Sequence, residues 1–188
     1  DYEQSQKLTS SQIESISDSI ESTNEQSGNK VPVGKLIKGY KWYIVGIVEK
    51  YMAKMSELTG RNHGLFNYYG AENAKNIIVA MGSVTETIEE TIDFLNAQGG
   101  SYGLVKVHLY RPFSNKHLLE VIPASAERIC VLDRTKEPGS TGEPLYLDVL
   151  EVLKEKNIKV VGGRYGLSSK DVPLKDINAV FENIFSSN

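Results

Sequence analysis

From residue 76 onward, short apolar runs alternate with segments in which apolar residues recur every three or four positions. The runs predict buried strands at residues 76–81, 104–110, 128–132 and 158–161. The periodic segments predict helices at residues 85–96, 114–123, 143–156 and from Pro173 onward. This alternation is typical of βαβ units with right-handed crossovers. The sequence therefore predicts an α/β fold, a three-layer α/β/α sandwich with a mostly parallel sheet.

Each predicted helix carries its apolar residues on one face, which we expect to pack on the sheet. The expected inward residues are, in chain order, Ile88, Ile92, Leu95, Leu118, Leu119, Val121, Leu145, Tyr146 or Leu147, Val149, Leu150, Leu153, Leu174, Ile177, Phe181 and Ile184. Two glycines, Gly99 and Gly100, are expected to end the first of these helices, and Ser114 to cap the second.

The first 47 residues follow a different pattern, and we interpret them as an N-terminal extension that is separate from a domain at residues 48–188. Residues 1–30 contain eight serines. They predict either one short helix, with Ile13, Ile16 and Ile20 on one face, or disorder. Residues 31–37 and 41–48 are rich in β-branched and aromatic side chains, which predicts a hairpin-like β element. The extension is therefore expected to be irregular or β.

A helix is expected to open the second region, followed by an aromatic connector at residues 65–70 that closes the edge of a core. The helix ends at Gly60, a natural position for a left-handed residue. Its core-facing stripe is predicted to consist of Tyr51, Met52, Met55 and Leu58.

Composition narrows the classes of function. The chain has 188 residues, of which 40% are hydrophobic, and a net charge of −3. It therefore carries no electrostatic footprint for nucleic acid. No apolar run approaches the roughly 20 residues of a membrane-spanning helix, so we expect neither a nucleic-acid nor a membrane partner. One cysteine allows no internal disulfide, and we expect a cytoplasmic protein. The start at Asp1, without Met, predicts a fragment of a longer chain.

The charged loop after the strand at 128–132 is the first candidate for chemistry. Asp133, Arg134, Lys136 and Glu137 stand there within five residues. In α/β sheets, ligands bind where strands end, beside helix N-termini that offer free N–H groups. A solvated loop with self-neutralising charges explains the same residues, and the sequence leaves both interpretations open.

Two more strand ends carry candidate residues. Gly82 and Ser83 could bind an anion at a helix start, but a structural turn is favoured, with Ser83 or Thr85 as the cap. Arg164, in a glycine-rich segment, could grip a carboxylate or phosphate, or could form an ion pair. The three histidines, His63, His108 and His117, have no metal-ligand spacing, and we expect no metal site. No self-sufficient catalytic apparatus is visible in the sequence.

Several motifs carry a resemblance to a known family. They are Glu57-Leu58-Thr59-Gly60-Arg61, Phe66-Asn67-Tyr68-Tyr69-Gly70, Met81-Gly82-Ser83, Leu109-Tyr110-Arg111-Pro112-Phe113-Ser114, the run Leu132–Gly139, Gly142–Val149 and Gly162–Leu167. Together they resemble the pyruvate:ferredoxin (flavodoxin) oxidoreductases. The resemblance covers about residues 48–188 and points to their second domain, which is similar to the C-terminal domain of transketolases.

The resemblance implies a function for the enzyme of which this chain would be a part. The family oxidatively decarboxylates pyruvate with coenzyme A to acetyl-CoA and CO2. It uses thiamine diphosphate, Mg²⁺ and iron–sulfur clusters, and it passes electrons to ferredoxin or flavodoxin. The thiamine site and the clusters belong to other domains. The chain would thus bind no cofactor alone, and would brace the thiamine-binding domain and the homodimer as a non-catalytic piece.

The resemblance also gives the candidate residues a role at an interdomain or anion-binding loop. They are Asp133, Arg134, Lys136, Glu137, Arg164, Gly82, Ser83 and Arg111. Two other interpretations remain. The chain could be a free-standing α/β module that binds an anionic ligand, such as a nucleotide or coenzyme A, at its strand-end loops. Alternatively, residues 1–47, which depart from the family pattern, could be an interaction or envelope-associated element.

Overall fold

The computed structural model describes residues 33–186, and of residues 33–40, 185 and 186 only the backbone. The chain divides into two compact units, residues 1–44 and 45–188. In the first unit the described residues are the start of helix α2 (Val33–Thr59), which continues into the second. The short helix predicted with Ile13, Ile16 and Ile20 lies outside the described residues.

Helix α2 corrects the prediction of a β element at residues 33–48, because the described backbone there is helical. β-branched and aromatic residues favoured strands, but burial at helical spacing prevails over such weak propensities. Val45 is 1% exposed, and Val48 and Met52, three and seven positions later, pack against the same core. The helix ends as predicted: Gly60 has φ +67°, and its N–H donates to the carbonyl of Ser56.

The core-facing stripe predicted for this helix is wrong at three of its four positions. Tyr51 and Met55 are each 48% exposed and Leu58 is 82% exposed, whereas Met52 packs against the core. The error follows from placing the start of the helix at residue 49. Because the helix was expected to begin after Val45, the predicted stripe left out the residue that determines which face of α2 is buried.

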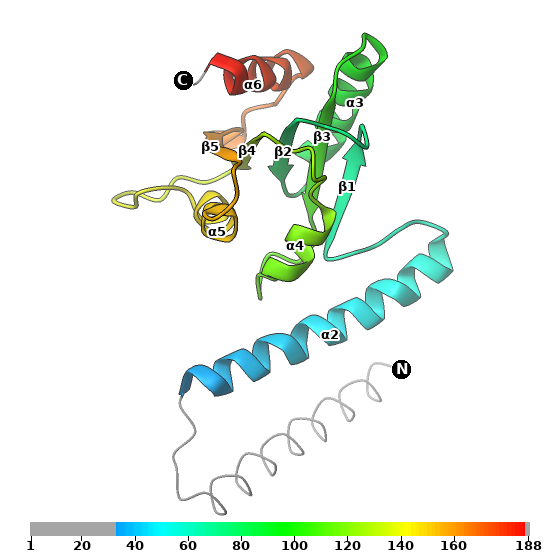
Figure 1. Ribbon diagram of the computed structural model, residues 1–188, viewed down its shortest axis with the longest axis vertical. Coiled ribbons are helices and arrows are strands. Elements are labelled where there is room, and N and C mark those ends of the chain that lie inside the picture. Colours follow the sequence, from blue (N-terminus) through cyan, green and yellow to red (C-terminus); the bar gives the residue numbers. More distant parts are fainter. Residues whose placement is uncertain (1–32, 187–188) are drawn as a thin grey trace, which may run out of the picture. The chain divides into compact units, whose positions relative to one another are not determined.

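The described residues form a five-stranded sheet in the order β1-β3-β2-β4-β5 (Figure 1). The strands are β1 (Phe66–Gly70), β2 (Asn76–Ala80), β3 (Tyr102–Val107), β4 (Arg128–Asp133) and β5 (Lys159–Arg164). Strands β2 to β5 pair in parallel, and β1 runs antiparallel to β3 with Phe66 opposite Val107. The mostly parallel α/β sheet is thus confirmed. The aromatic connector predicted at residues 65–70 is instead an edge strand.

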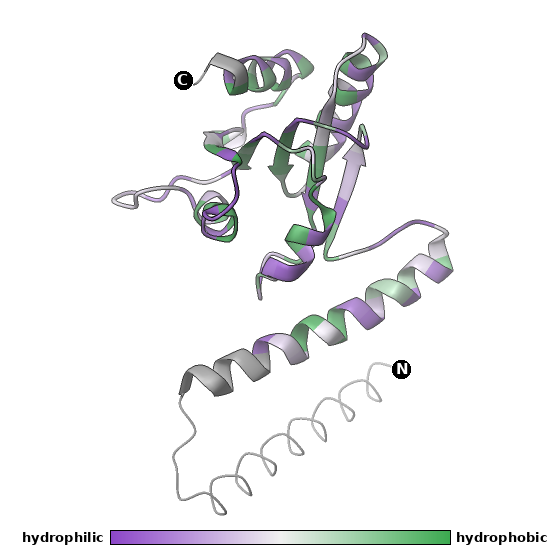
Figure 2. Cartoon of the chain, viewed as in Figure 1, coloured by the Kyte–Doolittle hydropathy of each residue, from purple (hydrophilic) through white to green (hydrophobic). Residues whose placement is uncertain are grey.

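Helices cover both faces of the sheet and complete the three predicted layers. One apolar cluster joins α3 (Val84–Ala97) and α6 (Leu174–Ser186) to the sheet. The other joins α4 (Asn115–Val121), α5 (Pro144–Leu153) and the part of α2 from Val45 onward. A short 3-10 turn, η1 (Leu167–Ser169), precedes α6. Figure 2 shows hydrophobic central strands and helices with hydrophobic stripes.

Most of the predicted inward residues are buried or half-buried, but two are not. Leu119 is 38% exposed and Leu174 is 42% exposed, so both face solvent. Strand β5 is also longer than predicted and ends at Arg164, so Gly162 and Gly163 lie in the strand and not in a loop. No helix among residues 33–186 is long and apolar enough to cross a membrane.

Candidate functional site

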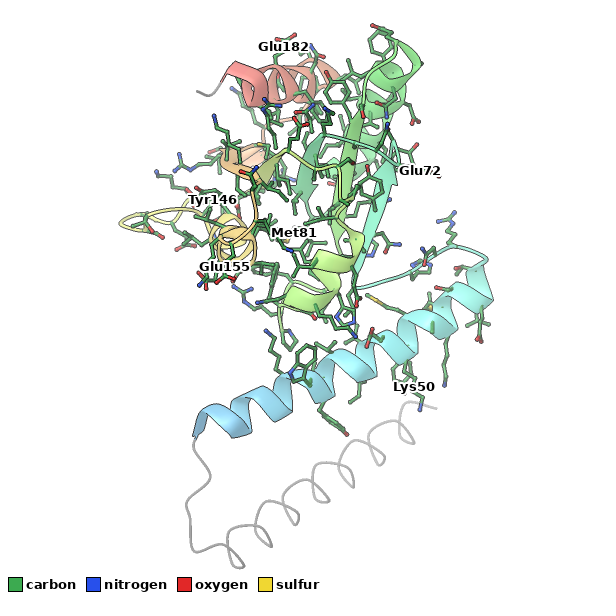
Figure 3. The ribbon with its side chains drawn as sticks, in the orientation of Figure 1. Lys50, Glu72, Met81, Tyr146, Glu155 and Glu182 are labelled. Carbon is green, nitrogen blue, oxygen red and sulfur yellow. The ribbon has the colours of Figure 1, made fainter. Side chains whose placement is uncertain are left out.

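The loops after β2, β3, β4 and β5 meet at one edge of the sheet, because these four strands are parallel. This edge carries the candidate residues Gly82, Ser83, Arg111, Asp133, Arg134, Lys136, Glu137 and Arg164. Neighbouring strands β2 and β4 lead into helices on opposite faces, α3 and α5. Such a switch point is where open α/β sheets bind ligands. Figure 3 labels Met81 after β2 and Tyr146 in α5, which flank this edge.

Asp133, the last residue of β4, is 4% exposed and binds the N-terminus of α5. Its Oδ1 accepts the N–H of Leu145 and its Oδ2 accepts the N–H of Tyr146, both at 3.0 Å. Burial raises the pKa of Asp133, and the two N–H groups partly oppose this rise. The N–H groups that an anionic ligand would need at this helix therefore already bind a carboxylate of the chain.

Glu143, directly before α5, is the second buried carboxylate of this edge, with 5% exposure. Its Oε1 forms an ion pair with Nε of Arg164, and its Oε2 accepts the N–H of Glu137 at 2.7 Å. The guanidinium of Arg164 holds the pKa of Glu143 below its usual value. Of the two interpretations of Arg164, this contact supports the ion pair.

Asp133 and Glu143 thus hold the two ends of an exposed loop, residues 134–142, which we call the β4–α5 loop. At its tip, Pro138 and Gly139 (φ +84°) occupy the central positions of a turn closed by the N–H of Ser140 on the carbonyl of Glu137, at 3.2 Å. The loop projects away from the sheet (Figure 1, yellow). Its charged side chains, those of Arg134, Lys136 and Glu137, are exposed.

The candidate residues on the neighbouring loops make structural contacts. Arg134 donates from Nε to the carbonyl of Gly166 at 3.3 Å, just past β5. Arg111, after β3, forms an ion pair with Asp148 of α5 at 2.7 Å and stacks on the ring of Tyr110. The first contact joins the loops after β4 and β5, and the second joins the loop after β3 to helix α5.

The turn after β2 agrees with its prediction at Gly82 but not at the helix cap. Gly82 has φ +81°, as a sharp turn requires, and Ser83 stands at the N-cap position of α3. Its side chain makes no capping hydrogen bond, and Thr85 donates from Oγ1 to the carbonyl of Gly82 at 2.8 Å. The expected side-chain cap is therefore absent at this turn. Instead, the backbone N–H of Thr85 bonds to the carbonyl of Gly82, and that of Glu86 bonds to the carbonyl of Ser83.

Three residues whose side chains make contacts at this edge were not singled out from the sequence: Glu143, Asp148 and Tyr165. Glu143 had a local signal, because a carboxylate directly before a proline is typical of a helix start. Tyr165 donates its hydroxyl to the carbonyl of Met81 at 3.2 Å and so bridges the ends of β5 and β2. Asp148 and Tyr165 had no local signal, since their partners lie far away in the chain.

The histidines take up structural contacts as well. Nε2 of His117 lies 2.8 Å from a carboxylate oxygen of Glu49, and its Nδ1 lies 2.5 Å from Oγ of Ser114. Ser114 stands at the N-cap of α4 but bonds to this ring and not to a backbone N–H, which corrects its predicted capping role. Among residues 33–186, no three His, Cys, Asp or Glu side chains are grouped to hold a metal ion.

Comparison with known proteins assigns the chain to a family. A family model described as pyruvate:ferredoxin oxidoreductase core domain II matches residues 74–177. The chain belongs to this family. The matched core domain II region contains β2 to β5 with their carboxyl-end loops, and therefore most of the candidate edge.

Full-length relatives of core domain II are much longer than this chain. A pyruvate-flavodoxin oxidoreductase from Enterobacter agglomerans is 56% identical over 140 residues, covering 73% of this chain and 12% of that protein. A pyruvate:ferredoxin oxidoreductase from Moorella thermoacetica is 57% identical over 141 residues, with 74% and 12% covered. Among solved structures, 2-oxoglutarate:ferredoxin oxidoreductase from Magnetococcus marinus aligns with a TM-score of 0.46 and 16% identity, covering 69% of this chain and 21% of that chain.

Proposed function

We propose that the chain acts as a non-catalytic structural domain of a cytoplasmic pyruvate:ferredoxin (flavodoxin) oxidoreductase. The complete enzyme would oxidatively decarboxylate pyruvate with coenzyme A to acetyl-CoA and CO2, and would reduce ferredoxin or flavodoxin. Membership of core domain II and identities of 56–57% to two such oxidoreductases support this assignment. The chain spans about an eighth of those relatives, so the rest of the enzyme would supply the catalytic groups.

The observation that carries the structural role is the way in which the β4–α5 loop is held. Its tip is exposed, yet both of its ends are fixed by buried carboxylates, Asp133 and Glu143. A loop that is ordered before contact loses little conformational entropy when a neighbour binds. We infer that Arg134, Lys136 and Glu137 present charges to the thiamine-binding domain and brace both it and the homodimer.

The chain's own residues fit poorly with the cofactors that the family implies. Cys130 is its one cysteine, is buried in β4, and burial raises the pKa of its thiol to about 12. An iron–sulfur cluster needs several thiolates, so it does not fit here. The first N–H groups of α5 already bind Asp133 and offer no place for a diphosphate. We propose that other domains of the enzyme bind thiamine diphosphate, Mg²⁺, the clusters and coenzyme A, as the family resemblance implies.

The bracing role is tested in the full-length enzyme by the double replacement Arg134→Ala with Lys136→Ala. We expect weaker dimer assembly on size-exclusion chromatography and a lower turnover of pyruvate. The matched control is Lys156→Ala with Lys159→Ala, which removes the same charge near the start of β5, at the opposite edge of the sheet. If the first variant assembles and turns over like the control, the loop does not brace the enzyme.

A further inference from the structure

Helices α3 and α6 enclose an apolar hollow on the face of the sheet opposite to α5. Its volume is about 310 Å³. We call this surface the α3–α6 face, and its lining residues are Glu90, Thr91, Phe94, Leu174, Lys175 and Asn178. Both helices contact each other directly, and both belong to the 45–188 unit.

Two large apolar side chains at this face are exposed, although most of the large apolar side chains of α3 and α6 are buried against the sheet. Ile88, Ile92, Ile177 and Phe181 are at most 1% exposed, whereas Phe94 is 64% and Leu174 is 42% exposed. An apolar side chain standing out beside an apolar hollow is typical of a surface that contacts another polypeptide. Thr91 in the floor is satisfied, since it donates from Oγ1 to the carbonyl of Thr87 at 2.8 Å.

Helix α3 makes one side of the hollow acidic, whereas Lys175 of α6 carries the one positive charge among the lining residues. Helix α3 contains four carboxylates and no basic residue. Glu89 is paired with Lys106, and Asp93 accepts the hydroxyl of Tyr69. Glu86 and Glu90 are exposed, and Glu90 stands on the rim of the hollow. Lysine or arginine side chains of a partner would therefore be attracted to the same helix that presents Phe94.

We propose that the α3–α6 face docks a basic amphipathic helix of another polypeptide, which places a bulky apolar side chain in the hollow. A furrow between two helices suits an amphipathic helix whose apolar residues recur at helical spacing. The volume lies at the lower limit of the roughly 300–1,000 Å³ typical of small-molecule pockets, which favours a single side-chain anchor. This face lies across the sheet from α5, so its partner need not be the domain that contacts the β4–α5 loop.

The test uses the 188-residue chain and two synthetic 14-residue peptides. One places leucines on one helical face and lysines on the other, and the second has glutamate at every lysine position. With isotope-labelled protein, we expect the lysine peptide to shift amide resonances of α3 and α6, with an affinity that falls as salt rises. The glutamate peptide should leave these resonances unchanged.

Two variants and one control make the test decisive. Phe94→Ser and, separately, Glu90→Lys should each weaken binding of the lysine peptide about tenfold. Both positions are exposed, so neither change should unfold the chain, as circular dichroism would verify. Tyr51→Ser, at an exposed position of α2, is the control and should not change the affinity.

Four outcomes would overturn the proposal. The lysine peptide could shift resonances elsewhere on the chain and not in α3 and α6. The two variants could bind like the control, or the glutamate peptide could bind equally well. Finally, the α3 and α6 resonances could broaden with protein concentration in the absence of peptide, which would show that a second copy of this chain is the occupant.

Discussion

Oδ1 of Asp133 accepts the backbone N–H of Leu145 at 3.0 Å, so the last residue of β4 caps a helix that begins eleven residues later. This single contact joins strand, loop and helix at the carboxyl edge of the sheet. It also explains why a charged residue is buried there, because a carboxylate that accepts backbone N–H groups is compensated for its loss of water.

Replacing the capping carboxylate should therefore destabilise the whole domain. In Asp133→Ala, the N–H groups of Leu145 and Tyr146 lose their acceptor inside the protein. We expect the free energy of unfolding to fall by about 1–3 kcal/mol, measured by urea denaturation. The control is Glu155→Gln, an exposed carboxylate just after α5, which should stay within about 0.5 kcal/mol of the parent. Equal stability of the two variants would contradict the capping role.

The Glu143–Arg164 ion pair predicts how stability depends on pH. The pKa of Glu143 is lower in the folded chain than its usual 4.5. A carboxyl of this kind stabilises the fold above its unfolded-state pKa, and the contribution is lost as the pH falls through the folded-state value. Between pH 7 and pH 3, the Tm of the parent should thus fall more steeply than that of Glu143→Gln.

Two other carboxylates, Asp133 at this edge and Glu127 at the opposite edge of the sheet, allow a check on that sign. The raised pKa of Asp133 works in the opposite direction, so its contribution is lost as the pH rises through the folded-state value. Glu127 has a lowered pKa as well, through Lys75, but both side chains are about half exposed. Glu127→Gln should flatten the pH profile less, because solvent screens an exposed pair. A profile of Glu143→Gln that is parallel to the parent would refute the prediction.

The sequence predicted those parts of the fold that depend on local periodicity. Strands β2 and β4 and helix α3 were found at nearly their observed bounds, because short apolar runs and helical stripes report burial directly. Strand β1 was missed since only Phe66 of its five residues is buried and it pairs with β3, more than thirty residues away. The first half of helix α2 was not predicted as helix, because its β-branched and aromatic residues favoured a strand.

The candidate edge was predicted in place but not in its internal contacts. The order of the strands brings Gly82, Arg111, Asp133 and Arg164 to one edge, and that follows from parallel pairing alone. The partners of these residues do not follow from the sequence. Asp133 looked like one of several free charges until its buried bonds to α5 were known. Long-range contacts of this kind depend on the packed structure and leave no periodic trace.

Gly162 lies against an aromatic ring, which predicts a packing limit in β5. A β-carbon at this position would lie 3.0 Å from Cγ of Tyr146, closer than ordinary contact. We expect Gly162→Ala to lower the free energy of unfolding by about 1–3 kcal/mol, because either the ring or the strand must move. The control is Gly46→Ala in α2, where a β-carbon would meet nothing within 4 Å. That change should stabilise the helix by about 0.5–1 kcal/mol. Opposite signs for the two alanines are the expected result in urea denaturation.

The phase of α2 gives a last test, since it decides which side of this helix belongs to the domain core. Val45 is 1% exposed, and Leu58, on the same helix, is 82% exposed. Val45→Ala should cost about 1–3 kcal/mol of stability through lost apolar burial and a cavity. Leu58→Ala should change stability by less than about 0.5 kcal/mol. The core-facing stripe that the sequence predicts includes Leu58. If that stripe were correct, Leu58→Ala would cost more stability than Val45→Ala. Thermal and urea unfolding of the two variants therefore distinguish the two arrangements, and a larger loss in Leu58→Ala than in Val45→Ala would reject the helix phase described above.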